Sequence, residues 1–239
     1  MYKDNYHIFH GKTVKMLTCS DCNIRCKHCY ISFKGNFDGE ELAHIVDNLS
    51  NEFEVRINGT EPLLHKEYLQ SIKKVHQTMV LTNGLVFKDN YSYIDELKIY
   101  GIDTIGISYH FDFHDDISSV KKKYLEKLFV IIISKGLDIR IMSTITSKNY
   151  KKVLEYCEFC KNLGIRKIRF TNFMLQGNAT NLEKSLILTD AERQEFFEII
   201  DKARSFYPIE TLKITRCDHL ARILILQRNF IAVVELIRL

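Results

Sequence analysis

The stretch Cys19-Ser20-Asp21-Cys22-Asn23-Ile24-Arg25-Cys26-Lys27-His28-Cys29-Tyr30 holds four of the seven cysteines of this 239-residue chain. The last three cysteines are separated by three residues and then by two, a spacing that lets one loop wrap around three corners of an iron–sulfur cubane. The fourth iron of such a cubane would be an open Lewis-acid site for a chelating substrate. We therefore expect Cys22, Cys26 and Cys29 to bind a [4Fe–4S] cluster.

Two other metal sites could use the same cysteines. In a zinc site the pairs Cys19–Cys22 and Cys26–Cys29 would be only three residues apart, whereas zinc sites usually separate their pairs much further. A ferredoxin-type cluster with Cys19 as fourth ligand would need a spacing that differs from the bacterial ferredoxin motif. We interpret Cys19 as a bystander at the end of the first apolar strand.

Composition excludes several classes of protein. The formal net charge of +4 is spread along the chain, and no basic stripe interleaved with aromatic residues predicts nucleic-acid binding. The N-terminus lacks the apolar core of a signal peptide, and charged or polar residues interrupt the apolar tail 223–239, so no membrane partner is expected. A cytoplasmic location follows, where disulfides are rare.

Short apolar runs alternate with longer segments of helical period, the pattern of repeated βα units. Such units imply a parallel sheet with right-handed crossovers. Polar or cysteine-rich segments follow several runs, which fits a barrel mouth better than the single switch point of an open doubly wound sheet. We expect an α/β fold, a partial (β/α)6 TIM-like barrel with a short C-terminal extension. The expected strands are Val14–Leu17, Phe53–Ile57, Met79–Leu81, Thr104–Ile107, Leu137–Met142 and Lys167–Phe170.

Apolar residues spaced as on one face of a helix occur between these strands. They predict helices over 42–49, 124–133 and 153–164, and a fourth helix from about Asp190 to Arg204. Gly101, Gly136 and Gly164 precede strands and are expected to end helices.

At the cysteine stretch the chain resembles the radical S-adenosylmethionine (radical SAM) superfamily, whose signature is C-x3-C-x2-C. Gly59-Thr60-Glu61-Pro62 resembles the Gly-Gly-Glu-Pro segment of that family in a Gly-Thr-Glu-Pro variant. The resemblance covers about residues 14–180. It implies an N-terminal extension over 1–13, the barrel over 14–205 and a C-terminal extension over 206–239.

The resemblance also implies which residues hold SAM. Glycine in a tight turn lets backbone groups approach the methionine ammonium closely. The turn Thr82-Asn83-Gly84 resembles the polar turn that lies near the sulfonium and ribose of SAM. The segment Gln176-Gly177-Asn178-Ala179 resembles a turn that lies near the adenine. The residues so assigned are Gly59, Thr60, Glu61, Pro62, Thr82, Asn83, Ser108, Ser143 and Gln176.

Two further segments carry residues suited to chemistry. His114-Asp115-Asp116-Ile117-Ser118 resembles the His-Asp-x-x-Arg segment of peptide-modifying relatives, with Ser118 where some of them place an arginine for the SAM carboxylate. A lysine from 121–123 would have to replace it, and we interpret His110, Asp112 and His114 as a polar loop near the mouth. Cys157 and Cys160 lie on the apolar face of a predicted helix and are interpreted as core.

The C-terminal extension supports two interpretations. Thr211–Thr215 predicts a further strand, and Arg222–Leu226 with Phe230–Val234 predicts a hairpin, although a plain helix over 219–239 fits the same residues. Relatives of the SPASM or Twitch type carry auxiliary clusters in this region. No cysteine follows Cys217, so we expect an incomplete extension and a single cluster.

The resemblance implies reductive cleavage of SAM at the cluster to a 5′-deoxyadenosyl radical, which abstracts hydrogen from a substrate in the barrel mouth. An electron donor such as flavodoxin or ferredoxin is implied as a partner. The Gly-Thr-Glu-Pro and His-Asp segments favour peptide or protein maturation. The alternatives are a small-molecule dehydrogenase, a cofactor-biosynthesis enzyme, or an iron–sulfur electron carrier or sensor that never cleaves SAM.

Anaerobic reconstitution should give about four irons and four sulfides per chain. Replacing Cys22, Cys26 or Cys29 with Ala should abolish the cluster, whereas Cys19→Ala, Cys157→Ala and Cys160→Ala should retain it. Iron and sulfide analysis measures both outcomes. A full cluster in the Cys22/Cys26/Cys29 triple variant would contradict the ligand assignment.

Overall fold

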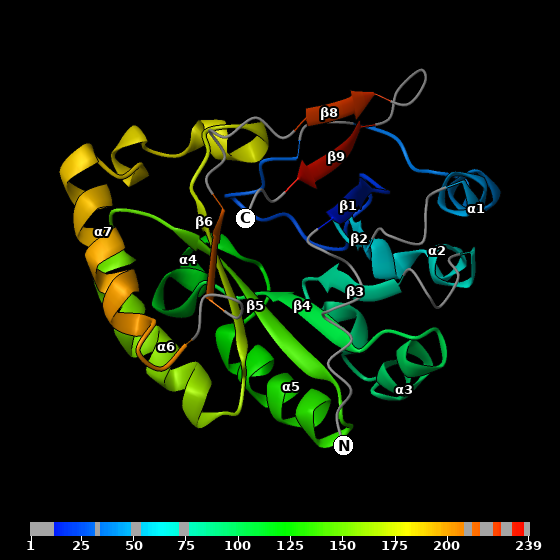
Figure 1. Ribbon diagram of the computed structural model, residues 1–239, viewed down its shortest axis with the longest axis horizontal. Helices are drawn as coiled ribbons and strands as arrows, with labels where there is room; N and C mark the ends of the chain where they lie inside the picture. Colours follow the sequence, from blue (N-terminus) through cyan, green and yellow to red (C-terminus); the bar gives the residue numbers. More distant parts are fainter. Residues whose placement is uncertain are drawn as a thin grey trace.

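The computed structural model describes residues 12–31, 34–48, 54–71, 77–207, 212–215, 222–225 and 231–236. Its strands form one sheet in the order β7-β6-β5-β4-β3-β2-β1-β9-β8 (Figure 1). The strands are β1 Lys12–Leu17, β2 Glu54–Asn58, β3 Gln77–Thr82, β4 Thr104–Ser108, β5 Asp138–Ile145, β6 Lys167–Asn172, β7 Leu212–Thr215, β8 Arg222–Ile225 and β9 Ile231–Leu236.

Strands β1 to β7 are parallel, and each pairs with the next one along the chain. A doubly wound sheet reverses its strand order at a switch point, and this run of strands contains no reversal. The prediction of a partial barrel is therefore confirmed. All six expected strands are present, and the predicted strand at Thr211–Thr215 extends the parallel sheet as β7.

The helices lie around the outside of the curved sheet (Figure 1). All four predicted helices are present, while α2, α3 and α4 were not predicted. The ends of α3, α5 and α6 carry Gly101, Gly136 and Gly164 at φ of 81°, 79° and 77°, as expected of helix-ending glycines. The helices are α1 Gly39–Asp47, α2 Lys66–Ser71, α3 Ser92–Ile99, α4 His114–Ile117, α5 Lys122–Ser134, α6 Val153–Asn162 and α7 Asp190–Ala203. Within the described ranges, none is long and apolar enough to cross a membrane.

The two faces of the sheet differ in chemistry. Side chains alternate between faces along a strand. On β4, β5 and β6 one set belongs to the buried apolar core, namely Ile105, Ile107, Ile139, Ile141, Ile168 and Phe170. We call the opposite side the inner face. It carries Gly106 and Ser108 of β4, Arg140, Met142 and Thr144 of β5, and Lys167, Arg169 and Thr171 of β6.

The C-terminal strands form a hairpin. β8 pairs antiparallel with β9, and β9 pairs antiparallel with β1 at the other edge of the sheet. The hairpin prediction is therefore confirmed, and the alternative of one plain helix is wrong. Cys217 and the turn Gln227–Asn229 lie outside the described residues.

Candidate functional site

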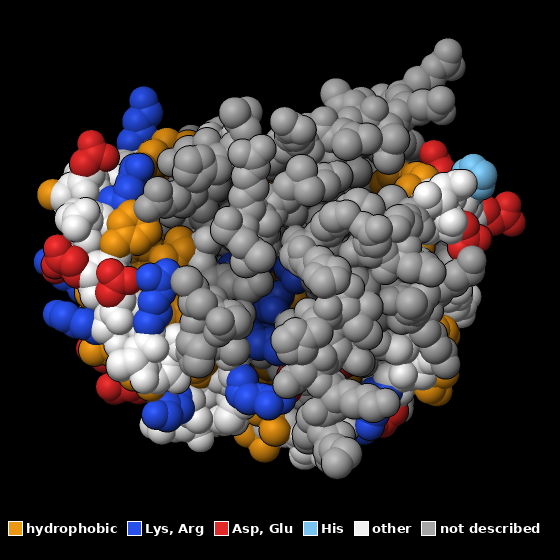
Figure 2. Space-filling view, in the orientation of Figure 1, with side chains coloured by type: hydrophobic (Ala, Val, Ile, Leu, Met, Phe, Trp, Pro, Cys, Tyr) orange, Lys and Arg blue, Asp and Glu red, His pale blue; other side chains and the backbone are white. Residues whose placement is uncertain are grey.

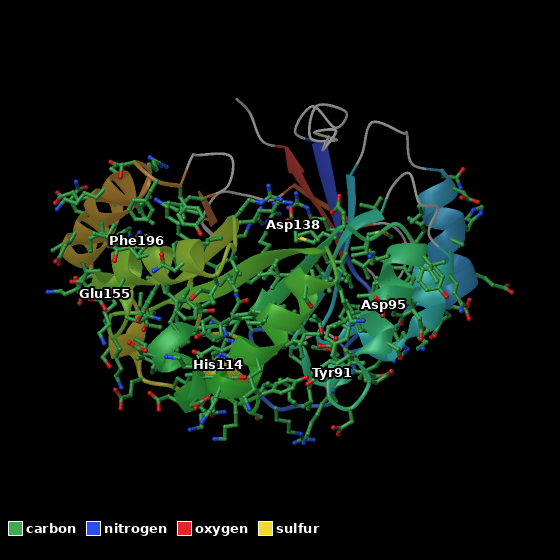
Figure 3. The ribbon with its side chains drawn as sticks, turned by 90° about the horizontal axis from the view of Figure 1, so that it is seen from below. Tyr91, Asp95, His114, Asp138, Glu155 and Phe196 are labelled. Carbon is green, nitrogen blue, oxygen red and sulfur yellow. The ribbon has the colours of Figure 1, made fainter. Side chains whose placement is uncertain are left out.

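The predicted site residues lie in segments that follow the carboxyl ends of parallel strands. In a parallel sheet the carboxyl ends of all strands meet at one edge, which in a barrel forms the mouth. Figure 3 shows this polarity. His114, which follows β4, lies at the opposite end of the strands from Asp138, which begins β5.

The cysteine loop after β1 separates Cys19 from the other three cysteines. Cys19 is wholly buried and forms an isolated bridge with Asn36. Its sulfur packs against Gly59 so closely that an added Cβ there would lie 2.7 Å from it. Burial raises the pKa of the Cys19 thiol. Cys19 is therefore a core residue, in agreement with its interpretation as a bystander.

Cys22 is exposed, and Cys26 and Cys29 are half-buried. Burial of the sulfur raises the pKa of the Cys22 thiol to about 11, and nearby negative charge on Glu61, Cys26 and Cys29 adds to the shift. Among the described residues no three metal-ligating side chains close on a single ion. A cubane does not require this, because each thiolate binds a different iron.

The Gly-Thr-Glu-Pro segment after β2 holds the start of the cysteine loop. The backbone N–H of Thr60 donates to the carbonyl of Cys19 at 3.1 Å, and that of Glu61 donates to Asp21 at 3.1 Å. The Thr60 hydroxyl also donates to the Asp21 carbonyl. Pro62 is buried at the start of a short 3-10 turn, Pro62–Leu64. These contacts explain why the segment follows its strand as a tight turn.

Glu61 joins this segment to the loop after β3. Its wholly buried carboxylate accepts a hydrogen bond from the Thr82 hydroxyl at 2.8 Å and another from the Asn83 N–H at 2.7 Å. Burial raises the pKa of Glu61 from 4.5 to about 7, although both hydrogen bonds oppose the shift. The side chain therefore supports the Thr82-Asn83 turn instead of facing open solvent.

Asn83 continues the chain of contacts to the cysteine loop. Its side-chain oxygen accepts from the Leu85 N–H at 2.8 Å. Its side-chain nitrogen donates to Asn23 Oδ1 at 2.8 Å and lies 3.7 Å from Cys22 Sγ. The structure thus brings a predicted SAM-binding residue against a predicted cluster ligand.

The segment after β4 packs against the middle of the cysteine loop. Lys27 N–H donates to the Ile117 carbonyl at 2.9 Å, and the Ser119 hydroxyl donates to the Arg25 carbonyl at 3.1 Å. Ser118 Oγ lies 3.8 Å from Cys26 Sγ. These contacts were not predicted from the sequence.

Lys122, one of the three lysines that could replace the missing arginine, is engaged elsewhere. Lys122 Nζ pairs with Asp112 at 2.8 Å, and Lys152 pairs with the same carboxylate at 3.0 Å. These pairs hold the pKa of Asp112 below its usual range.

The turn after β6 supports the end of the cysteine loop. Asn178 N–H donates to the Cys29 carbonyl at 2.8 Å, and its side chain donates to the Cys26 carbonyl at 3.2 Å. Gly177, at φ 57°, approaches so closely that a Cβ would lie 2.6 Å from the Cys29 carbonyl oxygen. Gln176 is exposed beside them. Its expected role near the adenine stays a prediction.

Three histidines gather near the mouth. The ring of His28 meets that of His110 edge-on at 4.3 Å, and His110 stacks on His114 at 5.4 Å. His110 and His114 are buried, at 3% and 0% exposure, so the interpretation of this segment as a polar loop was wrong for both. Each accepts a backbone N–H at Nδ1, from Thr144 and His110 respectively.

Burial lowers the pKa of both imidazoles, so they stay neutral and carry their proton at Nε2. Neither Nε2 has a hydrogen-bond partner among the described residues, and the same holds for the buried hydroxyl of Ser143. Ser108 is half-buried at the end of β4. The Nε2–H donors left in this state at the mouth fit a site that a polar ligand completes. Ser143 alternates with Ile141 along β5 and therefore lies on the core side of the sheet.

Comparison with known proteins gives relatives but no matching family model. The chain is 28% identical to GTP 3′,8-cyclase of Helicobacter pylori over 84% of its length and 65% of that protein. It is 21% identical to Fe-coproporphyrin III synthase of Methanosarcina barkeri, over 82% of its length and 54% of the relative. The chain therefore spans about two thirds or less of the curated relatives that it matches.

Solved structures share the fold. SuiB of Streptococcus suis, solved with the precursor peptide SuiA, has a TM-score of 0.68 and 17% identity, over 85% of this chain and 48% of that one. Native anSMEcpe, solved with AdoMet and the Cp18Cys peptide, has a TM-score of 0.63 and 14% identity, over 79% and 58%. The chain is therefore similar in sequence to GTP 3′,8-cyclase and Fe-coproporphyrin III synthase, and similar in fold to SuiB and anSMEcpe.

The raised pKa of Glu61 predicts a pH-dependent stability. Because its folded-state pKa of about 7 exceeds the ordinary 4.5, the stability it adds is complete below pH 4.5 and is lost as pH rises through 7. The side chain introduced by Glu61→Gln is neutral at every pH. The free energy of unfolding of this variant, relative to that of the native protein, should therefore rise between pH 5 and pH 8 by at most about 3 kcal/mol. Urea unfolding of the cluster-free protein measures the difference, with Glu40→Gln at the exposed start of α1 as control. A difference in free energy of unfolding between Glu61→Gln and the native protein that is the same at pH 5 and pH 8 would contradict the raised pKa of Glu61.

Proposed function

We propose that this chain is a radical SAM enzyme that binds a [4Fe–4S] cluster through Cys22, Cys26 and Cys29 and acts on a small anionic molecule. The three half-exposed or exposed thiols on one loop support the cluster. When bound, the cluster and SAM together supply reductive SAM cleavage and hydrogen abstraction. The chain itself supplies the binding surfaces.

The residues around the loop have separable roles in this proposal. Glu61 orders the turns after β2 and β3, where Gly59, Thr60, Thr82 and Asn83 are proposed to line the SAM site. The neutral His110 presents an Nε2–H donor at the mouth, buried beside the cysteine loop. Its position suits an oxygen or nitrogen acceptor on SAM or substrate, and its burial keeps competing water away.

The observation that carries the substrate proposal is a layer of buried cations. Arg140, Lys167 and Arg169 occupy the inner face, and each is at most 6% exposed. Arg140 and Lys167 are register partners on neighbouring strands. Figure 2 shows Lys and Arg side chains in the middle of one face of the molecule. Positive groups gathered at one level of the inner face raise the local electrostatic potential, which favours the binding of an anion there.

A fourth cation, Arg56 of β2, is 4% exposed and pairs in register with Met79. The guanidinium of Arg140 reaches over to Met79, with Nη1 3.6 Å from its sulfur. Lys167 is held by Thr104 at 3.0 Å and by Asp138 at 2.9 Å. Planar guanidinium groups bind phosphate and carboxylate oxygens in pairs, so this layer favours a multiply charged oxyanion.

The layer lies below the mouth. Arg140 precedes Thr144 by four residues on β5, and Thr144 N–H contacts His110. At about 3.3 Å per residue the two levels are roughly 13 Å apart. A substrate with its reacting carbon at the mouth and an anionic group at the other end would span that depth. A nucleoside triphosphate, the substrate class in the name of GTP 3′,8-cyclase, has this shape.

Peptide maturation was the expected activity, and the sequence relatives do not favour it, because those named make or modify small molecules. SuiB supports the fold alone. A flavodoxin or ferredoxin as electron donor remains part of the proposal. An electron carrier that never cleaves SAM is the alternative that the first experiment excludes.

Anaerobically reconstituted protein with reductant and SAM should release 5′-deoxyadenosine and methionine, measured by liquid chromatography. Cys26→Ala, which removes one proposed cluster ligand, should release neither. A full cluster that leaves SAM intact under reducing conditions would contradict the proposed activity and favour the electron carrier.

Inorganic tripolyphosphate tests the substrate class apart from the radical chemistry. Calorimetric titration should show binding that weakens with added salt. Arg140→Gln should weaken it about tenfold by loss of a charged hydrogen-bonding group. Arg204→Gln, which removes an arginine paired with Asp201 on α7, should leave it unchanged.

Melting temperatures without ligand show whether each variant is folded, and Arg140→Lys, which keeps the charge, should bind at an intermediate strength. No binding to the native protein, or equal binding to Arg140→Gln, would contradict an anionic substrate. That result would leave the proposal that the protein cleaves SAM intact.

A further inference from the structure

Two of the three proposed cluster ligands have a hydrogen-bonding side chain directed at the sulfur. Asn83, after β3, approaches Cys22, and Ser118, after β4, approaches Cys26. Both side chains come from loops far along the chain from the cysteine motif. They are therefore features of this fold's loops and not of the three-cysteine spacing.

The hydrogens of Asn83 are oriented by its other contacts. Its Oδ1 accepts the Leu85 N–H at 2.8 Å, which fixes which end of the amide is oxygen. One hydrogen on Nδ2 then goes to Asn23 Oδ1 at 2.8 Å. The second hydrogen is left for Cys22 Sγ at 3.7 Å, within the range of an N–H···S contact. Asn83 is only 7% exposed, so this orientation is shielded from water.

The hydroxyl of Ser118 is oriented in a similar way. Its oxygen accepts the Val120 N–H at 3.2 Å. Its own hydrogen is therefore available for Cys26 Sγ, 3.8 Å away. In a cluster the sulfur is a thiolate without a hydrogen, so Ser118 must be the donor and Cys26 the acceptor. The neighbouring Ser119 differs, because its hydroxyl donates to the Arg25 carbonyl at 3.1 Å.

Hydrogen bonds to cluster sulfurs are one of the properties that set the reduction potential of an iron–sulfur cluster. A donor withdraws electron density from the thiolate and so stabilises the state with one more electron. We propose that Asn83 and Ser118 are positioning residues that donate hydrogen bonds to the Cys22 and Cys26 thiolates and make the cluster easier to reduce. This inference rests on the proposed function, because it requires the cluster on these cysteines.

The hydroxyl of Ser118 gives the cleaner test. Reconstituted protein is titrated with reductant in the presence of mediators, and the reduced cluster is followed by electron paramagnetic resonance. Ser118→Ala should shift the midpoint potential to a more negative value at unchanged iron content. Ser118→Thr, which keeps the hydroxyl, should restore the native value. Ser119→Ala removes the adjacent hydroxyl that does not face a sulfur, and should not shift it.

The amide of Asn83 is tested with a charge-matched pair. Asn83→Asp keeps an oxygen for the Leu85 N–H but replaces the donor with an acceptor. Asn23→Asp places the same charge beside Cys22 while keeping the oxygen that Asn83 contacts. The shift to negative potential should be larger for Asn83→Asp than for Asn23→Asp, because only the former loses the N–H···S contact.

An unchanged potential in Ser118→Ala, together with an equal or smaller shift in Asn83→Asp than in Asn23→Asp, would overturn the inference while leaving the cluster assignment intact. A native protein that binds no cluster would overturn the proposed function and this inference together. Iron analysis distinguishes the two failures before any potential is measured.

Discussion

The buried carboxylate of Glu61 is the contact on which the geometry of the site depends. It accepts hydrogen bonds from Thr82 and Asn83, while its own backbone N–H donates to Asp21 of the cysteine loop. One residue thus ties together the loops that follow β1, β2 and β3. Removing the carboxylate would leave two buried donors without an acceptor, which costs more than the hydrogen bonds contribute. Asn83, held in this way, then reaches Cys22.

The cysteine loop contains no helix or strand over residues 21–31 and is held by its neighbours. Contacts from the segment after β4 fix Arg25 and Lys27, and Asn178 after β6 fixes the carbonyls of Cys26 and Cys29. The strands of the partial barrel must therefore be assembled to place the thiols, and a cluster bound there would stabilise the assembled sheet in return. This coupling links the fold directly to the chemistry.

The parallel strands could be predicted because each is a buried apolar run followed by a polar turn. Helix α2 has only six residues, too few for a clear stripe, and was missed. The segment 222–236 could not be assigned to hairpin or helix from its own pattern, since the deciding partner, β1, lies two hundred residues earlier. Motif residues such as Glu61 and Asn83 were found by resemblance. Ser118 and Asn178 were also named by resemblance, but their contacts with the cysteine loop were not predicted, because these contacts join residues about 90 and 150 positions apart.

The central claim is that the three thiols hold a cluster whose fourth iron is open to SAM. Electron paramagnetic resonance of the reduced, reconstituted protein with and without SAM tests it most directly, because a ligand on the open iron changes the electronic structure of the cubane. We predict a one-electron-reduced [4Fe–4S] spectrum whose g-values shift when SAM is added. A cubane spectrum that SAM leaves unchanged, or one that persists in the Cys22/Cys26/Cys29 triple variant, would contradict it.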